Sequence, residues 1–470
     1  MTSSKEIDSK VASAKSNLSS KNLSREEIET VQDILKTDSR PVPPVLKQES
    51  TKNLGNLDIP KERYFSQEYH DQEVEKLWKK VWQWACREEN IPNVGDYVVY
   101  EIADLSVIVI RTKPNKISAF YNSCLHRGMQ LCVGEGKTSN LRCPYHGWTW
   151  KLDGTLAHIP CRWDFEHVND NDFRLPEVKV DTWQGFVFIN FDPNCESLEN
   201  YLENIPEHFQ QFAFPLEKRF TALHVAQVIN TNWKVALEAM MEAYHIFATH
   251  PQMLKHAGDI NSKYNIYGRH SYMVFPSAMQ SPYLGKPQDP QAPAKAMMDY
   301  MGIDRDIKLT SKGMNSRAYA AEAVRQNLNQ HLGVDLSDVS DTEMIDAISY
   351  FVFPNSIIMP VVGQPAQLRF RPYGNNPDFC IMDLLTLLPS SLENTPPPAK
   401  TRWLTSEEKW SDVPEIQPEE VGVVLDQDFA NLPLIQKGLK TSAKPGITLA
   451  NYQESRIRHF HLVLDKYLSD

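Results

Sequence analysis

The spacing of hydrophobic positions changes several times along the chain, and each change predicts a different kind of element. Between Ser66 and Trp84, apolar residues recur every three or four positions, which predicts a helix. After Pro92 the apolar residues alternate or run together between turn residues, which predicts short strands. The predicted strands cover residues 97–100, 106–110, 117–120 and 185–189, and the last of them is expected to begin a second domain.

The second half of the chain predicts helices around a group of strands. Residues 197–257 are expected to be mainly helical, and 258–345 mixes turns and prolines with two helices, 292–301 and 315–330. The predicted strands there cover 349–361, 366–372 and 379–388. A last helical region is expected from Asp428 through Gln436 and then over Tyr452–Leu468.

The first 55 residues have a different composition. They are rich in Ser, Lys, Glu and Asp, with a proline break over 40–44. Ser24 and Glu27 form a capping-box pattern ahead of Ile28 and Val31, which predicts one short helix. The remainder has too little apolar surface to fold alone, so we predict a mobile arm over residues 1–55.

Bulk composition narrows the class of protein. The 470 residues are 41% hydrophobic and 23% charged, as expected for a globular chain of two domains. The net charge of −11 argues against nucleic acid or an anionic membrane as a partner. Without a secretory signal or an apolar run of about 20 residues, we expect a soluble, cytoplasmic protein. In that compartment free thiols are expected, rather than a disulfide between Cys132 and Cys161.

Two Cys-His pairs are the most specific chemical feature of the sequence. Cys124 and His126 stand one residue apart, and Cys143 and His146 follow after sixteen intervening residues. Two thiolates and two imidazoles are what a Rieske [2Fe-2S] cluster requires. The alternative is a structural zinc site, although zinc ribbons favour C-x-x-C at both ends. The flanks resemble the C-x-H-R-G and C-P-x-H-G-W signatures of Rieske domains.

A second constellation occupies the apolar segment 232–250. A helix that is hydrophobic nearly all round is buried, and Glu238, Glu242 and His245 would share one face of it. Buried charges on such a face need partners or a metal. The alternative is an amphipathic helix with a hydrated stripe and satisfied histidines. His245 and His250 are five residues apart, so joint ligation predicts a π-type turn or a helix end near Ala248.

Together the two motifs resemble the large (alpha) subunit of Rieske non-haem iron oxygenases, which hydroxylate rings or demethylate. The likeness spans roughly residues 60–460. It implies that Cys124, His126, Cys143 and His146 hold a [2Fe-2S] cluster, and that His245 and His250 bind one Fe(II). The third iron ligand is expected about eight residues before a Gln-x-Gly-Leu, which indicates Asp428, with Asp426 as the competitor.

The resemblance also gives roles to the two glutamates. Glu242 falls where family members carry the acid that links the cluster of one subunit to the iron of its neighbour in a ring of three. Glutamate there is similar to the demethylase and carnitine-oxygenase branch. Glu238 is a candidate to support the site from outside the ligand set.

The fold implied is α+β: a Rieske β domain ahead of a catalytic domain with an antiparallel sheet flanked by helices, of the helix-grip (Bet v1/START-like) type. The predicted domains are a mobile arm (1–55), a helical segment packing on the catalytic domain (56–91), the Rieske domain (92–180) and the catalytic domain (181–470).

The function implied is that of a terminal oxygenase using O2 and electrons from NAD(P)H. The chain has no G-x-G-x-x-G, so a flavin- or ferredoxin-type reductase is expected as partner, with or without a separate ferredoxin. The family also implies a homotrimer, in some members with a small beta subunit. A Rieske electron carrier or a zinc-stabilised binding protein are the alternatives, and neither explains both motifs.

The class of substrate is the property that the sequence predicts least well. Large apolar residues suggest pocket walls for a bulky apolar or aromatic small molecule, and a quaternary-ammonium substrate for oxygenation or demethylation is the alternative. The residues predicted to line the pocket are Phe247, Met253, Phe275 and Phe353, with Tyr267, Met273, Met279, Phe351 and Met359 as further candidates. The sequence does not distinguish mono- from dioxygenation.

Overall fold

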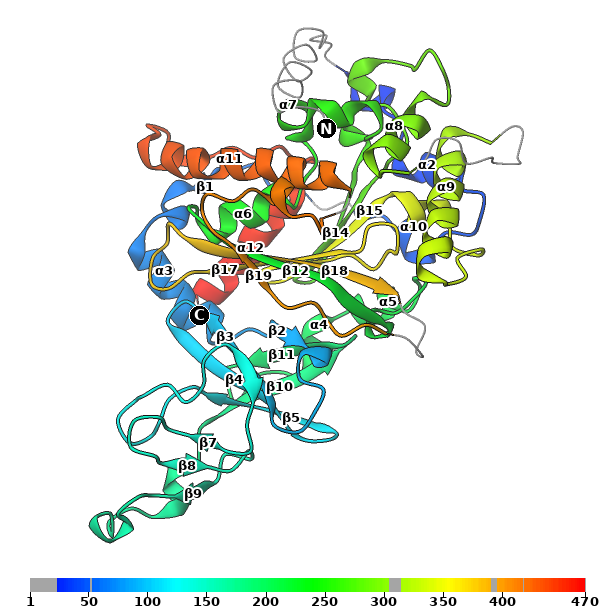
Figure 1. The fold of residues 1–470 in the computed structure, drawn as a ribbon. Helices are drawn as coiled ribbons and strands as arrows, with labels where there is room; N and C mark the ends of the chain where they lie inside the picture. Colours follow the sequence, from blue (N-terminus) through cyan, green and yellow to red (C-terminus); the bar gives the residue numbers. More distant parts are fainter. Residues whose placement is uncertain (1–22, 51–52, 304–313, 390–394, 417, 470) are drawn as a thin grey trace. The chain divides into compact units, whose positions relative to one another are not determined.

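The computed structural model describes residues 23–50, 53–303, 314–389, 395–416 and 418–469 (Figure 1). The chain forms two compact units. Unit 1 comprises residues 1–66, 204–370 and 377–465, and unit 2 comprises 67–203, 371–376 and 466–470. In the described part of the chain, no helix combines the length and apolarity needed to cross a membrane.

Unit 1 is built on an eight-stranded sheet that is antiparallel except at its last pair, β12 and β19. The strand order is β13-β14-β15-β16-β17-β18-β12-β19. The bounds are β12 Arg219–Ile229, β13 Lys263–Tyr267, β14 His270–Phe275, β15 Ala347–Val352, β16 Ser356–Ile358, β17 Ala366–Pro372, β18 Cys380–Pro389 and β19 Arg402–Leu404. The strands predicted within 349–388 are therefore confirmed.

Strand β12 overturns part of the prediction for 197–257. Eleven residues there form the long partner of β18, with Ile229 opposite Cys380. Along β12, buried and half-buried positions alternate over most of its length, as expected for a strand with one covered face. The helical interpretation was wrong here because it averaged this period-two stretch with the helices on either side.

Three helices carry or support the site. They are α6 Trp233–Ala239, α11 Glu419–Thr441 and α12 Ser455–Ser469 (Figure 1). Phe460 of α12 meets Trp233 of α6 at 5.7 Å between ring centroids and Phe351 of β15 at 5.6 Å. Helix α6 contacts both β18 and α11. Residues distant in sequence are thereby brought together above the sheet.

Three further helices form a separate apolar cluster of unit 1. They are α8 Ala292–Tyr300, α9 Ser316–Leu332 and α10 Asp341–Ile345, and the first two confirm the predicted ranges 292–301 and 315–330. A buried ion pair fixes α9 to the end of α10: the Arg317 guanidinium donates to both Asp346 oxygens at 2.8 Å.

The described N-terminal residues pack on unit 1. Ser24 caps a single 3-10 turn, and a second helix, α2 Val31–Leu35, follows. Val45 and Leu46 are fully buried, and the Lys263 ammonium donates to the Leu46 and Gln48 carbonyls. For residues 23–50 the structure therefore differs from the predicted mobile arm, because most of their apolar residues are buried and the segment around Leu46 is bonded to β13. The rest of that prediction lies largely outside the described residues.

Unit 2 contains a seven-stranded antiparallel sheet and a three-stranded sheet. The orders are β2-β11-β10-β5-β4-β3-β6 and β7-β8-β9. The larger sheet comprises β2 Gln83–Arg87, β3 Asp96–Ile102, β4 Leu105–Lys113, β5 Lys116–Tyr121, β6 Glu135–Lys137, β10 Glu177–Trp183 and β11 Phe186–Asn190. The smaller comprises β7 Leu141–Arg142, β8 Thr149–Trp150 and β9 Leu156–His158.

Two expectations for unit 2 need correction. The run 185–189 does form a strand, β11, but it pairs with β2 and β10 in this unit instead of beginning the second domain. The helix predicted over 66–84 is shorter: α3 Gln67–Glu73 and a π-helical turn Val74–Trp78 precede strand β2. Both Trp82 and Trp84 are buried, so their apolar spacing reflects burial and not helix.

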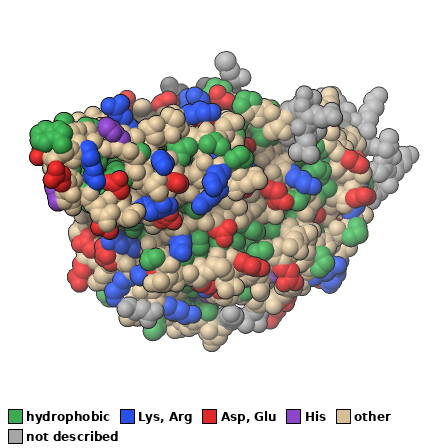
Figure 2. Space-filling model, turned by 90° about the horizontal axis from the view of Figure 1, so that it is seen from below, with side chains coloured by type: hydrophobic (Ala, Val, Ile, Leu, Met, Phe, Trp, Pro, Cys, Tyr) green, Lys and Arg blue, Asp and Glu red, His purple; other side chains and the backbone are tan. Residues whose placement is uncertain are grey.

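The surface of the molecule carries charged side chains of both signs. On the face in Figure 2, Lys and Arg side chains are interspersed with Asp and Glu. The net charge of −11 is therefore not gathered into one acidic area on this face.

Candidate metal centres

Two similar loops present the Cys-His pairs of unit 2. One follows β5 and the other connects β7 to β8. In the first, the Gly128 N–H donates to the Cys124 carbonyl at 2.8 Å; in the second, the Gly147 N–H donates to the Cys143 carbonyl at 3.1 Å. Both glycines have positive φ, +78° and +76°, which a side chain would strain. The repeated geometry explains why each cysteine is followed by glycine at the same distance.

The four predicted cluster ligands come together between these loops. Cys124 and Cys143 are both buried, and the imidazoles of His126 and His146 lie 4.7 Å apart between ring centroids. Burial raises the pKa of the Cys124 thiol, and the neighbouring Cys143 thiol raises it further. The structure thus separates the set into a thiol pair and an imidazole pair.

The chemistry of this donor set fits a Rieske cluster. His126 Nδ1 is buried and has no hydrogen-bond partner among the described residues, which is what a ligand nitrogen without its metal looks like. Trp148 stacks on the His126 ring, 5.1 Å away and only 2° from parallel. The other cysteines are free thiols in the described chain; Cys132 is buried and Cys161 exposed.

The second centre depends on an interrupted helix in unit 1. Asn232 caps α6 by accepting from the Lys234 N–H at 3.0 Å, but α6 ends at Ala239. A short helix, α7 Ile246–Thr249, follows the turn, and His250 lies just beyond its end. The single face predicted for Glu238, Glu242 and His245 is therefore wrong. The helix end expected near Ala248 is confirmed.

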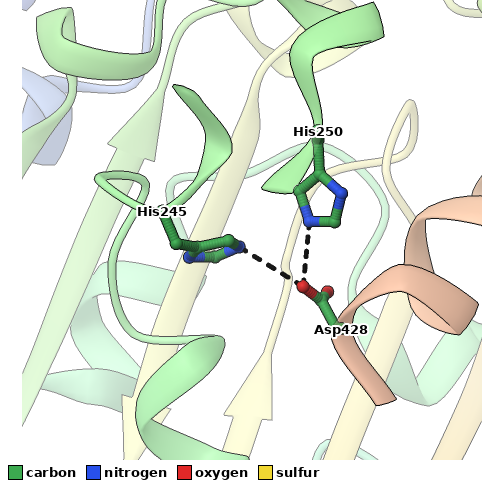
Figure 3. A group of neighbouring side chains, drawn as sticks. All are labelled: His245, His250 and Asp428. Carbon is green, nitrogen blue, oxygen red and sulfur yellow. Dashed lines mark ion pairs between the residues drawn. The ribbon is translucent and has the colours of Figure 1, made fainter. Parts of the chain in front are cut away.

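His245, His250 and Asp428 converge from α7 and α11 (Figure 3). An Asp428 carboxylate oxygen lies 2.9 Å from His250 Nε2 and 3.6 Å from His245 Nε2. One ligand atom from each residue lies within 4.8 Å of the others. His250 Nε2 is buried and forms no hydrogen bond with the described residues. Two imidazoles and one carboxylate on one side are the donor set of a non-haem Fe(II) facial triad.

Each histidine of the triad is oriented through its other ring nitrogen. Glu242 Oε1 lies 2.7 Å from His245 Nδ1, and Gln427 Oε1 lies 2.7 Å from His250 Nδ1. An amide oxygen only accepts, so His250 Nδ1 carries the hydrogen and Nε2 has its lone pair free for a metal. Burial lowers the pKa of His245, but the carboxylates of Glu242 and Asp428 outweigh it and leave that pKa raised.

Gln427 is a site residue that sequence reasoning missed. Its side chain also accepts from Gln252 Nε2 at 2.8 Å, which ties the segment after His250 to α11. The available signal was its position next to Asp428. Gln436, nine residues after Gln427 on α11, fixes this helix to the start of α6. Its amide oxygen accepts from the Asn232 N–H at 3.2 Å.

Asp426, the competing ligand, points elsewhere. Its carboxylate accepts from the Trp410 N–H at 2.7 Å and from the Ser411 N–H at 3.3 Å. These contacts hold a loop against α11, and the triad is formed by Asp428 instead.

Glu238 takes part in a buried hydrogen-bonded cluster. Its carboxylate accepts from the Tyr64 hydroxyl at 3.0 and 3.1 Å, and His461 Nε2 lies 2.8 Å from Oε1. Burial raises the pKa of Glu238 to about 8, although the Tyr64 hydroxyl and the Lys234 and Arg63 charges favour its ionised form.

A cavity of about 190 Å³ lies beside the triad. Its lining includes His245 and Asp428 as well as Glu238, Glu242 and Tyr64. The rest is formed by Val235, Ala239, Thr249, Asn431, Leu432, Ile435, Leu439, Ile447, Leu449, Glu454 and Ile457.

The predicted pocket residues lie in two other places. Met253 and Phe275 belong to one apolar cluster, with Phe247 packed against it and against Tyr283 at 4.3 Å between ring centroids. Phe353 packs instead against Phe460, 6.2 Å away. None of the four lines the cavity beside the triad.

Comparisons with known proteins match both halves of the chain. Residues 214–470 match the family described as ring hydroxylating alpha subunit (catalytic domain), and residues 81–169 match the Rieske [2Fe-2S] domain. The carnitine monooxygenase oxygenase subunit of Escherichia coli K12 is 34% identical over 194 residues, 41% of this chain and 52% of the relative. The glycine betaine monooxygenase oxygenase subunit of Pseudomonas aeruginosa PAO1 is 32% identical over 203 residues, 43% and 46% respectively.

Other relatives act on aromatic compounds by name. The biphenyl 2,3-dioxygenase alpha subunit of Rhodococcus jostii RHA1 is 29% identical over 191 residues, 40% of this chain and 42% of that protein. These matches span about half the length of the curated relatives.

Solved structures share the fold. A quaternary ammonium Rieske monooxygenase superposes with a TM-score of 0.63 at 19% identity, covering 88% of this chain and 96% of the other. A naphthalene 1,2-dioxygenase superposes with a TM-score of 0.62 at 18% identity, covering 89% and 94%.

Proposed function

The chain belongs to the family of ring-hydroxylating alpha subunits, and from this premise we propose that it is the terminal oxygenase of a multicomponent Rieske oxygenase. The observation that carries the proposal is the meeting of His245, His250 and Asp428, with His250 Nε2 buried and lacking a hydrogen bond to the described residues. Such a triad leaves further coordination positions open on a non-haem iron.

The proposed ligand sets are separate. Cys124, His126, Cys143 and His146 would hold a [2Fe-2S] cluster, and the triad would hold Fe(II). When bound, the two groups supply electron transfer and dioxygen chemistry, and the protein supplies orientation and electrostatics.

The surrounding residues prepare these sites. Glu242 and Gln427 fix the imidazoles of the triad so that both Nε2 atoms face the Asp428 carboxylate. The Trp148 ring covers one face of the His126 ring and limits how that imidazole can rotate. We further propose that Glu242 links this iron site to the cluster of a neighbouring copy in a homotrimer.

Electrons are proposed to come from NAD(P)H through a flavin- or ferredoxin-type reductase, with or without a separate ferredoxin. The sequence has no dinucleotide-binding G-x-G-x-x-G of its own, which supports a separate reductase. One of the similar solved structures, that of a quaternary ammonium Rieske monooxygenase, gives insight into inter-subunit electron transfer in that protein.

The leading substrate class is a bulky apolar or aromatic small molecule. The apolar cluster of Met253 and Phe275, with Phe247 packed against it, includes Ile246, the residue after His245, and this supports the choice. A dioxygenase of biphenyl is among the similar proteins.

A quaternary-ammonium substrate is the second candidate, and one observation favours it. The described residues that line the cavity beside the triad include four carboxylates, Glu238, Glu242, Asp428 and Glu454, and neither Lys nor Arg. In their ionised forms these carboxyl groups attract a cation and repel an anion. The carnitine and glycine betaine monooxygenase subunits are similar proteins whose names fit this class.

Metal analysis of anaerobically purified protein tests the function. About three irons and two sulfides per chain, with a Rieske-type electron-paramagnetic spectrum, are expected. His250→Ala should lose one iron and all oxygenation while keeping the cluster spectrum, and His126→Ala should lose the spectrum while keeping the triad iron. Zinc without sulfide would contradict the proposal. With a surrogate reductase, an aromatic panel and a trimethylammonium panel then separate the substrate classes.

A further inference from the structure

Glu238, Tyr64 and His461 form a buried three-residue network that the ligand sets do not use. They come from positions 64, 238 and 461 and are exposed by only 1%, 9% and 0%. Tyr64 Oη lies 3.0 Å from both Glu238 Oε1 and His461 Nε2, and His461 Nε2 lies 2.8 Å from the same carboxylate oxygen. We refer to these three residues as the acid network.

The hydrogens of the acid network can be assigned from its chemistry. Arg63 Nη1 lies 3.4 Å from His461 Nδ1, and a guanidinium can only donate, so Nδ1 accepts. His461 Nε2 then carries the hydrogen and donates to Glu238. The Tyr64 hydroxyl donates to the same carboxylate. Glu238 as an anion therefore has two donors in place, and it can lose a proton without leaving an unsatisfied buried charge.

Glu238 is nonetheless able to hold a proton near neutral pH. Burial raises its pKa to about 8, against the opposing effects of Tyr64, Lys234 and Arg63. Two further carboxylates, Glu242 and Glu454, face the same cavity. The protonated and ionised forms of Glu238 are thus close in free energy under ordinary conditions.

The cavity connects the acid network to the triad. Its lining includes Tyr64 and Glu238 as well as His245 and Asp428. Asn431 and the half-exposed Ile435 also line it, so the cavity reaches the surface. A volume of about 190 Å³ is enough for several water molecules, each of which takes about 30 Å³ in the liquid.

We propose that Glu238 is the proton donor of the oxygenation reaction, positioned by Tyr64 and His461 and connected to the triad through this cavity. The proposal rests on the oxygenase function proposed above. Incorporation of one oxygen atom follows O2 + RH + 2 e⁻ + 2 H⁺ → ROH + H2O, in which the reductase supplies the electrons. Protons must therefore enter a site whose histidines and aspartate are largely buried.

Each transfer from Glu238 moves one proton. The Glu238 carboxyl O–H bond breaks, and the proton passes to water in the cavity and on to the oxygen atom that leaves as water. The carboxylate that remains is held by the Tyr64 O–H and the His461 Nε2–H. It regains a proton from solvent where the exposed Asn431 lines the cavity, so two such transfers supply both protons of the water that is formed.

The competing explanation is that the acid network only ties α6 and α12 to the segment before unit 2. Glu238→Gln distinguishes proton delivery from this structural role, because glutamine keeps the size and an acceptor oxygen but cannot supply an acidic proton. Glu343→Gln is the matched control: Glu343 is also a buried glutamate, burial also raises its pKa, and it lies on α10 away from the cavity.

The first readout uses metal-free protein. Infrared difference spectra at pH 6.5 should show a protonated carboxyl band that Glu238→Gln removes, that Tyr64→Phe shifts and that disappears with an apparent pKa near 8. Glu343→Gln should leave this band in place. Absence of a band assignable to Glu238 would overturn the proposal whatever the enzyme's activity.

The second readout uses the fully loaded enzyme with its reductase. Glu238→Gln should lower kcat by at least about tenfold with KM unchanged, since general acids contribute 10²- to 10⁴-fold. The fall in rate above pH 8 and the solvent deuterium isotope effect should also disappear, and Glu343→Gln should retain both. An unchanged pH profile in Glu238→Gln would overturn proton delivery. If wild-type protein forms no product at all, the oxygenase function fails, and proton delivery fails with it while the infrared result stands.

Discussion

Asp428 and Asp426 stand two residues apart on one helix, and their exchange for asparagine should have opposite effects. Asp428 faces His250 at 2.9 Å and His245 at 3.6 Å, whereas Asp426 accepts from the Trp410 and Ser411 N–H groups. We predict that Asp428→Asn loses the iron and keeps the fold. Asp426→Asn should keep the iron and lose stability.

The magnitudes follow from these contacts. Removing a group that only orients a metal ligand costs 10- to 100-fold in affinity, so loss of the charged ligand itself should cost at least about 100-fold. With free Fe(II) at about 100 times the wild-type Kd, wild-type protein gains about 2.7 kcal/mol, and Asp428→Asn should gain less than about 0.5 kcal/mol. Asp426→Asn weakens hydrogen bonds to a charged acceptor and should cost about 2–4 kcal/mol with or without iron.

Anaerobic urea denaturation with and without ferrous iron measures both effects, and iron per chain is counted on the same samples. For Asp426→Asn we expect an unfolding midpoint at lower urea than in wild-type protein, and this midpoint should still depend on iron. For Asp428→Asn we expect a midpoint that does not depend on iron. If Asp428→Asn kept its iron while Asp426→Asn lost it, the assignment of the third ligand and the reasoning from these distances would be refuted.

Three other predictions follow from the contacts described. Glu242→Gln keeps a partner for His245 Nδ1 but removes its charge, so iron affinity should fall about 10- to 100-fold in a ferrous titration, and unchanged affinity would contradict the 2.7 Å contact. Arg317→Met leaves the buried carboxylates of Asp346 and Asp38 without their cation and should cost about 3–5 kcal/mol in urea, whereas the double variant Arg317→Met/Asp346→Leu should recover only the part due to Asp346. Since the pKa of Glu238 is raised from 4.5 to about 8, the folded state binds the extra proton between these values, and stability should fall as pH rises from 5 to 8. That fall should be smaller in Glu238→Gln, and equal slopes would show that Glu238 titrates normally.

The candidate metal-binding residues could be predicted because their chemistry restricts the choice. Two Cys-His pairs in sequence define one ligand set, and the spacing of His245 and His250 even indicated where a helix must end. The residues that hold the ligands and Glu238 in place were less visible. Gln427 was marked only by its place next to Asp428, and His461 by nothing in its neighbours. The contacts of both arise only when α11 and α12 pack in unit 1.

The fold was predictable where one period dominates a segment. Helix α9 and strands β17 and β18 have clear patterns and lie where expected. Strand β12 was missed although its alternation is visible, because it lies between helices and the wider region was interpreted as one kind of structure. The sheet to which a strand belongs could not be predicted. Strand β11 belongs to unit 2 because it pairs with β2, and local sequence does not encode such a long-range pairing.

The N-terminal segment has a practical consequence for engineering the protein. The family match for the cluster domain begins at residue 81, which invites shortened versions that start after residue 55. Such a version would lack Val45 and Leu46, whose fully buried side chains each contribute about 1.5–3 kcal/mol to the stability of the fold. It would also take both carbonyl acceptors from the Lys263 ammonium, a group whose pKa burial already lowers to about 8. Solubility tags should therefore be added ahead of this whole segment, and trimming should stop before Thr30, where the first described α-helix is capped.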